Sequence, residues 1–233
     1  MFEALSGVYT PQETFPGEKK IAYNLFARQT FDPSPLYPIC YIGPFILTDV
    51  LLPLLKRTAA EPGSDVRIVN VVVPLHANVT PTTFATQEAL NKDYSLPVLR
   101  QLETYGSTKL MNILHVKALQ TCLDAENANI TCLAVHPGGI ATKGSAGFMG
   151  SVPCVNGLLK HVVMPLFFSS WSAGGRVVVF AAAGKVMAGP RHNEYNGPYL
   201  APGIAMPSES ARDTRLQTEL YETTDRAVQE LGL

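Results

Sequence analysis

Residues 98–135 read VLRQLETYGSTKLMNILHVKALQTCLDAENANITCLAV, and this stretch decides the fold. Residues 98–125 are long and apolar enough for a helix of several turns, with polar residues interspersed. Residues 130–135 form a short apolar run, which is typical of a strand buried on both faces of a sheet. A helix of this length feeding such a strand predicts part of a parallel α/β sheet.

The preceding residues repeat the same pattern. Residues 43–60, GPFILTDVLLPLLKRTAA, predict a buried helix with cations near its C-terminal end and a bend at Pro53. Residues 66–73, VRIVNVVV, predict a second strand buried on both faces. We further expect a helix within residues 147–184, a short strand within 196–203 and a closing amphipathic helix over 216–231.

Composition narrows the class of protein. With 233 residues, 46% hydrophobic content and a formal charge of -1, the chain predicts one globular domain over residues 1–233. The near-neutral charge gives no field that would attract nucleic acid or an anionic membrane. Four scattered cysteines without metal-ligand spacing indicate reduced thiols of a cytoplasmic protein and no metal site. No secretion signal and no apolar run of transmembrane length are expected.

Tyr105 and Lys109 are the residues that carry chemistry. At a spacing of four they project from one face of the predicted helix, so the lysine ammonium is expected beside the phenol. A nearby cation favours phenolate, which predicts a tyrosine pKa lowered from about 10 toward neutrality. Such a tyrosine exchanges a proton with a carbonyl or alcohol oxygen. Taken alone, the pair also fits a solvated lysine and a half-buried tyrosine.

The arrangement resembles the short-chain dehydrogenase/reductase family, in which a Tyr-x-x-x-Lys motif lies on the helix after the fifth strand. Residues 43–48, 65–71, 136–142 (HPGGIAT) and 197–203 are similar to four further family stretches in the expected order. The nearest subgroup is the retinol-dehydrogenase-like and fungal reductases of secondary metabolism. The resemblance implies an α/β fold, a Rossmann-like doubly wound parallel sheet.

The resemblance also implies the ligands. The family uses a nicotinamide cofactor, here expected to be NADP, held by Tyr105 and Lys109 and by the turn after the sixth strand. In that turn the implied cofactor-binding residues are Pro137, Gly138, Ile140 and Thr142. The implied substrate is small and lipophilic. Residues 162–171 fall where the family carries its substrate lid, and ordinary packing of this apolar segment against the sheet fits equally well. Helices 43–60 and 98–125 correspond to those that build the family's dimer interface, so a homo- or heterodimer is expected.

The beginning of the chain departs from the family pattern. Residues 1–40 are polar and punctuated by proline, and they predict an irregular segment, so the resemblance is confined to 41–233. The family's glycine-rich turn, which binds pyrophosphate at a helix N-terminus, has no counterpart here. Residues 4–8 align with the end of the family's fourth strand. We therefore expect a sheet that lacks the first strands, either as a true truncation or from a misplaced gene start.

Two positions of the implied catalytic set are also changed. Val73 stands where the family has a serine that hydrogen-bonds the substrate, and Cys40 stands where it has a relay asparagine. Losing one such donor typically lowers the rate about 10² to 10³-fold. His76 is a minor candidate for a replacement donor. His136, before the Pro-Gly turn, is expected to be satisfied by backbone rather than to act as a base.

Three functions follow from these features. The first is an NADP-dependent oxidoreductase that interconverts a carbonyl and an alcohol through Tyr105 and Lys109. The second is a catalytically impaired relative that dimerises with a full-length member of the family. The third, with the least support, is a non-redox isomerase or dehydratase that uses Tyr105 as an acid.

Overall fold

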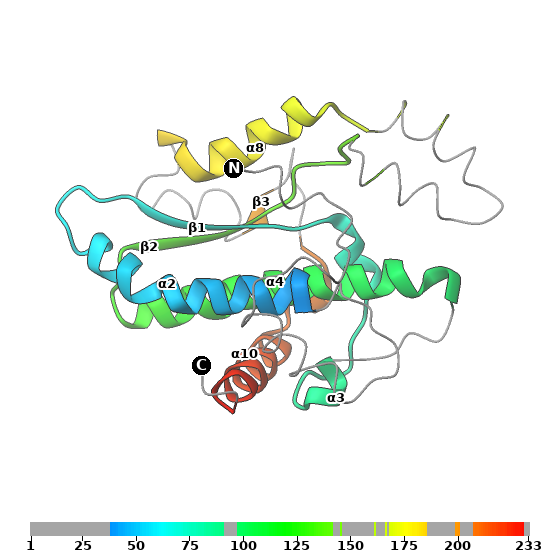
Figure 1. Ribbon diagram of the computed structural model, residues 1–233, viewed down its shortest axis with the longest axis horizontal. Coiled ribbons are helices and arrows are strands. Elements are labelled where there is room, and N and C mark those ends of the chain that lie inside the picture. Colours follow the sequence, from blue (N-terminus) through cyan, green and yellow to red (C-terminus); the bar gives the residue numbers. More distant parts are fainter. Residues whose placement is uncertain are drawn as a thin grey trace, which may run out of the picture.

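A parallel sheet between helices forms the centre of the molecule (Figure 1). The computed structural model describes residues 38–90, 97–141, 145, 161, 166, 168–185, 199–200 and 207–230. Strands β1 (Val66–Val71), β2 (Ile130–Val135) and β3 (Tyr199–Leu200) pair in parallel in the order β1-β2-β3. Both crossovers between paired strands carry helices, as a parallel sheet requires. The predicted parallel α/β sheet is confirmed.

Helices cover both faces of the sheet. Figure 1 shows α2 (Gly43–Ala59) and α4 (Pro97–Ala125) on one face and α8 (Trp171–Ala183) on the other. The predicted helices over 43–60 and 98–125 are confirmed to within one residue, and α8 is the helix expected within 147–184. The shorter elements are η2 (Pro38–Ile42), η3 (Pro74–Asn78), α3 (Gln87–Leu90) and α9 (Glu209–Arg212). Helix α10 (Thr214–Gln229) lies beyond α4, farther from the sheet.

Strand β2 separates two hydrophobic clusters. Cys132 and Ala134 point into the main core, which α4 and α10 complete, whereas Leu133 and Val135 pack with Ala181 of α8. Side chains of a strand alternate between the two faces, so the apolar run of β2 serves both clusters. The prediction of a strand buried on both faces is correct for β2.

For β1 the same prediction is only partly correct. The strand ends at Val71 rather than Val73, because Pro74 begins the 3₁₀ helix η3 and lacks an N–H for the ladder. Its residues are half-buried or exposed, since β2 is its only strand partner among the described residues. One ladder bond continues past the strand, from the Val72 N–H to the Val135 carbonyl at 2.8 Å.

A buried arginine ties the start of β1 to the end of α8. The Arg67 guanidinium donates to the Ala181 carbonyl at 2.9 Å and to the Gly184 carbonyl at 3.0 Å, and it pairs with Asp65. Carbonyls of the last helical turn lack partners within the helix, and a cation also suits the negative end of the helix dipole. Arg67 therefore fixes α8 against the sheet.

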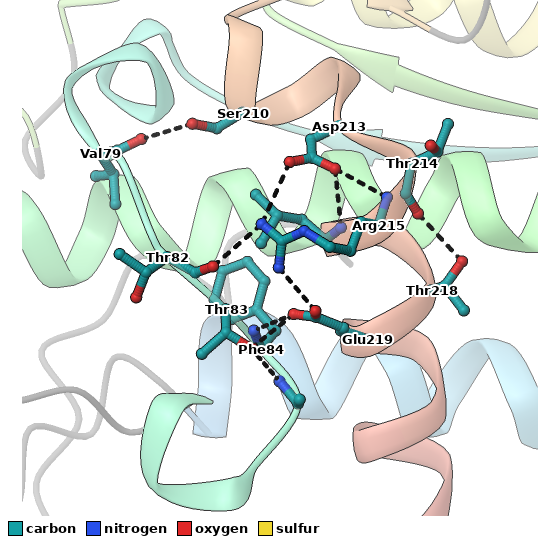
Figure 2. Close-up of polar contacts among 12 residues, drawn as sticks. Val79, Thr82, Thr83, Phe84, Ser210, Asp213, Thr214, Arg215, Thr218 and Glu219 are labelled. Carbon is teal, nitrogen blue, oxygen red and sulfur yellow. Dashed lines mark hydrogen bonds and ion pairs between the residues drawn. The ribbon is translucent and has the colours of Figure 1, made fainter.

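A second polar cluster joins α10 to the segment between η3 and α3 (Figure 2). One Glu219 carboxylate oxygen accepts from the Thr83 hydroxyl at 2.7 Å and from the Phe84 N–H at 2.8 Å, and the other accepts from Arg215 at 2.7 Å. Arg215 also donates to the Thr82 carbonyl at 3.1 Å. These bonds hold the pKa of Glu219 below its usual value, so the carboxylate stays charged near neutral pH.

The same cluster explains where α10 begins. The Asp213 side chain accepts from the N–H groups of Arg215 and Leu216 at 2.8 and 3.2 Å, which is an N-cap. The predicted helix over 216–231 therefore starts two residues earlier, at Thr214, and ends at Gln229. The strand predicted within 196–203 is confirmed as β3. Residues 1–37, which hold most of the expected irregular segment 1–40 and the alignment of 4–8, lie outside the described residues. The end of that segment, 38–40, is not irregular but belongs to η2.

Gly106 is the point where α4 comes closest to η3. A Cβ on Gly106 would lie 2.6 Å from the Leu75 carbonyl oxygen and 3.0 Å from a methyl group of Val79. We expect Gly106→Ala to lower the free energy of unfolding by about 1–3 kcal/mol, because a backbone atom must move. Urea unfolding of the purified variant measures this loss.

The matched control is Gly175 of α8, where an added Cβ would meet no atom within 4 Å. Gly175→Ala is expected to raise the free energy of unfolding by up to about 1 kcal/mol, the gain in helix propensity. Equal stabilisation by both substitutions would contradict the close approach of α4 and η3.

Candidate functional site

The carboxyl ends of β1 and β2 meet at one edge of the sheet. Val71 is in register with Val135, so the segments that follow them leave the sheet side by side. Open parallel sheets bind ligands in the crevice outside these strand ends. Helix α4 brings Tyr105 and Lys109 to the same edge, since the Lys109 ammonium donates to the Val71 carbonyl at 3.2 Å.

Tyr105 and Lys109 lie together, but not in the expected geometry. The Lys109 Nζ lies 5.5 Å from the centre of the Tyr105 ring, over the ring itself. This is a cation–π contact, in which the ammonium faces the negative π-surface of the ring. Both side chains are half-buried. The predicted pairing of the two residues is therefore present in the structure.

The expected lowering of the Tyr105 pKa is wrong for this geometry. Burial raises the pKa of the phenol above its usual value, and the nearby Cys40 raises it further. Burial likewise lowers the pKa of Lys109. Desolvation disfavours the charged form of each group and outweighs their attraction, because the ammonium lies over the ring and donates to a backbone carbonyl.

Cys40 lies beside this pair. It belongs to η2, a turn of π-helix, and it is half-buried. Burial raises the pKa of its thiol, while the charge of Lys109 acts in the opposite direction. Its backbone carbonyl accepts from the Asn112 side chain at 2.9 Å. The sequence predicts Cys40 only as a lost asparagine and gives no sign of Asn112, although Asn112 lies two turns after Tyr105 on the same helix face.

His76 does not face the site as a free donor. Its Nδ1 donates to the Val73 carbonyl at 2.7 Å, and its Nε2 accepts from the Ser208 N–H at 3.4 Å. Burial lowers its pKa, so the neutral ring that both bonds require is favoured. The idea that His76 replaces the absent serine is not supported, because both nitrogens already hold backbone groups. Val73 itself offers the edge no side-chain donor.

The turn after β2 is braced by the segment before α8. Ser169 makes two hydrogen bonds to the turn: its N–H donates to the Gly139 carbonyl at 2.7 Å, and its carbonyl accepts from the Ala141 N–H at 3.0 Å. Gly138 has a φ of +94°, which favours glycine. His136 Nδ1 accepts from the Gly138 N–H at 3.2 Å, which agrees with the expected backbone role of this histidine.

The predicted cofactor residues thus divide in two. Pro137, Gly138 and Ile140 lie in this braced turn at the same sheet edge as Lys109. Thr142 lies outside the described residues, as do 162–165 and 167 of the expected lid.

These residues fit one end of a nicotinamide cofactor. An ammonium has three N–H donors, and Val71 is the only hydrogen-bond acceptor that Lys109 has among the described residues. Its remaining donors suit hydroxyl groups, and the turn beside it exposes backbone at a glycine. Among the residues described, none supplies the glycine-rich turn that would hold the phosphates. The fit is therefore to the nicotinamide and its ribose.

Several known proteins with similar sequences are named as dehydrogenases or reductases. The chain is 38% identical over 194 residues to a short-chain dehydrogenase/reductase of Armillaria gallica, covering 82% of this chain and 60% of that protein. It is 34% identical over 200 residues to a short chain dehydrogenase/reductase of Colletotrichum higginsianum, with 82% and 48% covered. It is 32% identical over 197 residues to the chloroplastic short-chain dehydrogenase TIC 32 A of Brassica napus, with 82% and 56% covered.

The chain therefore spans about half to three fifths of the length of these relatives. No family model matches it. The crystal structure of an uncharacterized protein from Mycobacterium paratuberculosis is similar to the described fold, with a TM-score of 0.51 and 19% identity, over 83% of this chain and 58% of that one. Among the helices that the structure describes, none is long and apolar enough to cross a bilayer.

Proposed function

Because the chain belongs to the short-chain dehydrogenase/reductase family and has its Rossmann-like α/β fold, we propose that it is an NADP-dependent oxidoreductase. The proposed reaction interconverts a carbonyl and an alcohol on a small lipophilic or secondary-metabolite substrate. The strongest support is the meeting of Tyr105, Lys109 and the turn after β2 at one edge of the sheet. Two of the similar proteins named as short-chain dehydrogenase/reductase come from the fungi Armillaria gallica and Colletotrichum higginsianum.

Tyr105 is the proposed acid. Its raised pKa keeps the phenol protonated near neutral pH, which suits donation of a proton to a carbonyl oxygen and hence the direction of reduction. Lys109 is proposed to orient the cofactor ribose with the donors that Val71 leaves available. A bound NADPH would supply the hydride. Pro137, Gly138, Ile140 and Thr142 are proposed to contact its nicotinamide end.

A titration with NADPH, followed by nicotinamide fluorescence, tests this proposal. We expect saturable but weak binding to the 233-residue chain, because no described residue supplies the glycine-rich turn for the phosphates. A loss of about tenfold is expected in Lys109→Ala because a charge-assisted hydrogen bond is removed. Lys117→Ala is the matched control. Lys117 lies on the same helix and also donates to a backbone carbonyl, that of Ala211 at 2.9 Å, but from the part of α4 that faces α9.

Absence of binding up to millimolar NADPH would contradict the redox function for this chain. Equal loss in both lysine variants would indicate a general change in the helix rather than a cofactor contact. The same titration with NADH distinguishes the two nicotinamide cofactors.

A second candidate function, pairing with a copy of the chain or with a full-length family member, is favoured by the surface of α2. Leu47, Val50, Leu51 and Leu54 recur at helical spacing on this helix, and their exposed fractions run from 40% to 68%. Contiguous exposed apolar residues mark interaction surfaces. Helix α4 contributes less, because most of its described side chains are buried within the chain.

We expect the chain to sediment as a dimer at micromolar concentration and Val50→Arg to convert it to a monomer, because a charge would be buried in the interface. Val179→Arg is the matched control, since Val179 is a similarly exposed valine on α8, at 64%. A monomeric wild-type chain that captures no reductase would contradict this second function.

The proposed location is the cytoplasm. Cys40, Cys122 and Cys132 are free thiols among the described residues, which suits a reducing compartment. The similar proteins include a chloroplastic dehydrogenase of Brassica napus and an oxidoreductase of Neurospora crassa named as mitochondrial. Fractionation of cells that express the tagged full chain distinguishes these compartments.

A further inference from the structure

Asn112 connects the two elements that surround the candidate site. Its side chain is 3% exposed and donates through Nδ2 to the Cys40 carbonyl at 2.9 Å. On α4 it follows Lys109 by three residues and Tyr105 by seven, so all three project from one face of the helix. One side chain thus holds η2 against the face of α4 that carries the Tyr105–Lys109 pair.

The residue that Asn112 holds acts on that pair electrostatically. Ionisation of Cys40 would favour the ammonium of Lys109 and oppose ionisation of Tyr105, and the Lys109 charge in turn favours the Cys40 thiolate. These effects fall steeply with distance and rise as water is excluded. The placement of η2 therefore contributes to the charge environment of the site, in addition to burial, which is the larger cause of each pKa shift.

The conformation of η2 needs an external contact to hold it. The π-helix is rare, occurs mostly as a single turn and lies frequently at functional sites. Tyr41, the next residue, is also held from outside, by a 3.0 Å hydrogen bond between its hydroxyl and Thr224 of α10. The hydrogen bond from Asn112 is the corresponding contact on the side of Tyr105 and Lys109.

Two buried polar atoms add a second observation. The Asn112 Oδ1 acceptor and the Asn70 Nδ2 donor have no hydrogen-bond partner among the described residues. Asn70 shares its face of β1 with Val66 and Ile68, which pack against the main core below α4. Buried polar atoms in proteins nearly always have a partner, so the Asn112 acceptor, unpaired among the described residues, sets this side chain apart from an ordinary packing residue of α4.

We propose that Asn112 is a positioning residue of the Tyr105–Lys109 site, acting through the Cys40 carbonyl to fix the thiol and the η2 turn beside the pair. Its consequence for the reaction rests on the proposed function. The placement of Cys40 does not, and it can be measured without cofactor or substrate.

Alkylation of the full chain by iodoacetamide, read at each cysteine by peptide mass spectrometry over pH 7–10, tests the proposal. In the native sequence Lys109→Met is expected to slow Cys40 alkylation about threefold at pH 8, because the ammonium favours the thiolate. In Asn112→Leu we expect Cys40 to react at least about fivefold faster, because η2 is released and the thiol is less buried. In that background Lys109→Met is expected to have no effect.

Two controls keep the result interpretable. Gln120→Leu removes another amide of α4, one that bonds to backbone groups of Ile130 and Cys132, and it is expected to leave Cys40 at the native rate. Cys132, which is 1% exposed, reports on folding because it reacts only if the core opens. Where Asn112→Leu opens the core, Asn112→Asp gives the decisive result, since it keeps the shape and removes the donor. Its added negative charge would by itself slow the alkylation of Cys40, so faster alkylation in this variant reports release of η2.

Native Cys40 rates in both Asn112 variants would overturn the proposal, as would an unchanged response to Lys109→Met in those variants. Either result stands apart from the NADPH titration. Failure of cofactor binding with the expected alkylation pattern would remove the oxidoreductase function and keep the positioning role.

Discussion

Replacing Tyr105 with phenylalanine is expected to lower the rate of NADPH-dependent carbonyl reduction by about 10² to 10⁴-fold, the range that a positioned general acid supplies. The substitution removes only the hydroxyl, so the ring contact with Lys109 is retained and cofactor affinity changes little. The measurement is the loss of NADPH absorbance with a panel of lipophilic aldehydes and ketones.

Tyr221→Phe is the control for Tyr105→Phe. Tyr221 is a half-buried tyrosine of α10 in the aromatic cluster around His115, away from the sheet edge. We expect this variant to keep the native rate. A Tyr105→Phe rate equal to that of Tyr221→Phe would exclude Tyr105 as the proton donor.

The pH dependence of the rate gives an independent check on the same residue. The acid must be protonated to act, and burial raises its pKa above the usual value of 10.0. Reduction is therefore expected to persist into alkaline solution and to decline only above about pH 10. A decline centred near pH 7 would restore the lowered pKa that the Tyr-x-x-x-Lys spacing predicts.

Replacing His115 with phenylalanine is expected to make the protein markedly less sensitive to acid. His115 is 4% exposed, its ring lies 4.7 Å from that of Phe45, and neither nitrogen has a hydrogen-bond partner among the described residues. Burial lowers its pKa from 6.5 to about 4. Between pH 6.5 and about pH 4, His115 is therefore protonated in the unfolded chain but neutral in the folded chain.

The sign of the effect follows from this difference. The effect of His115 on the free energy of unfolding is smallest above about pH 6.5. The free energy of unfolding falls as the pH drops toward 4, because the unfolded state binds more protons over that range. The contribution of His115 amounts to about 2 kcal/mol at pH 5 relative to pH 7 and about 3 kcal/mol in full. His115→Phe removes this part of the slope.

Urea unfolding at pH 7 and pH 5 measures the change, with His161→Phe as the control because His161 is exposed. Loss of stability on acidification should be about 2 kcal/mol smaller in His115→Phe than in the native chain. An equal loss of stability in His115→Phe and in the native chain would mean that His115 is solvated or paired in the folded protein.

The sequence predicts those helices and strands whose boundaries depend on the hydrophobic pattern alone. Residues 43–60, 98–125 and 130–135 carry long apolar runs, and their boundaries are nearly correct. The end of β1 was missed because apolar character continues to Val73, whereas the strand stops where Pro74 cannot pair. The predicted start of α10 lies two residues too late, because the helix begins where Asp213 caps it rather than at Leu216.

The sequence predicts which residues form the site, but it does not predict their electrostatics. Spacing on a helix places Tyr105 and Lys109 on one face, and the structure agrees. Whether the ammonium reaches the phenol oxygen or lies over the ring depends on the Val71 carbonyl, 38 residues away in the chain. The role of Asn112 depends equally on a tertiary contact, since nothing local distinguishes it from an ordinary helix-surface amide.

The hydrogen bonds between α10 and residues 82–84 also have a consequence for folding during synthesis. Helix α10 is made after every other described element, yet Leu216, Leu220 and Val228 belong to the main core and Glu219 holds Thr83 and Phe84. The nascent chain therefore carries β1, α4 and β2 with one side of their core open until the last helix arrives. Over that interval the apolar face that α10 will occupy is exposed, which makes the nascent chain prone to aggregation.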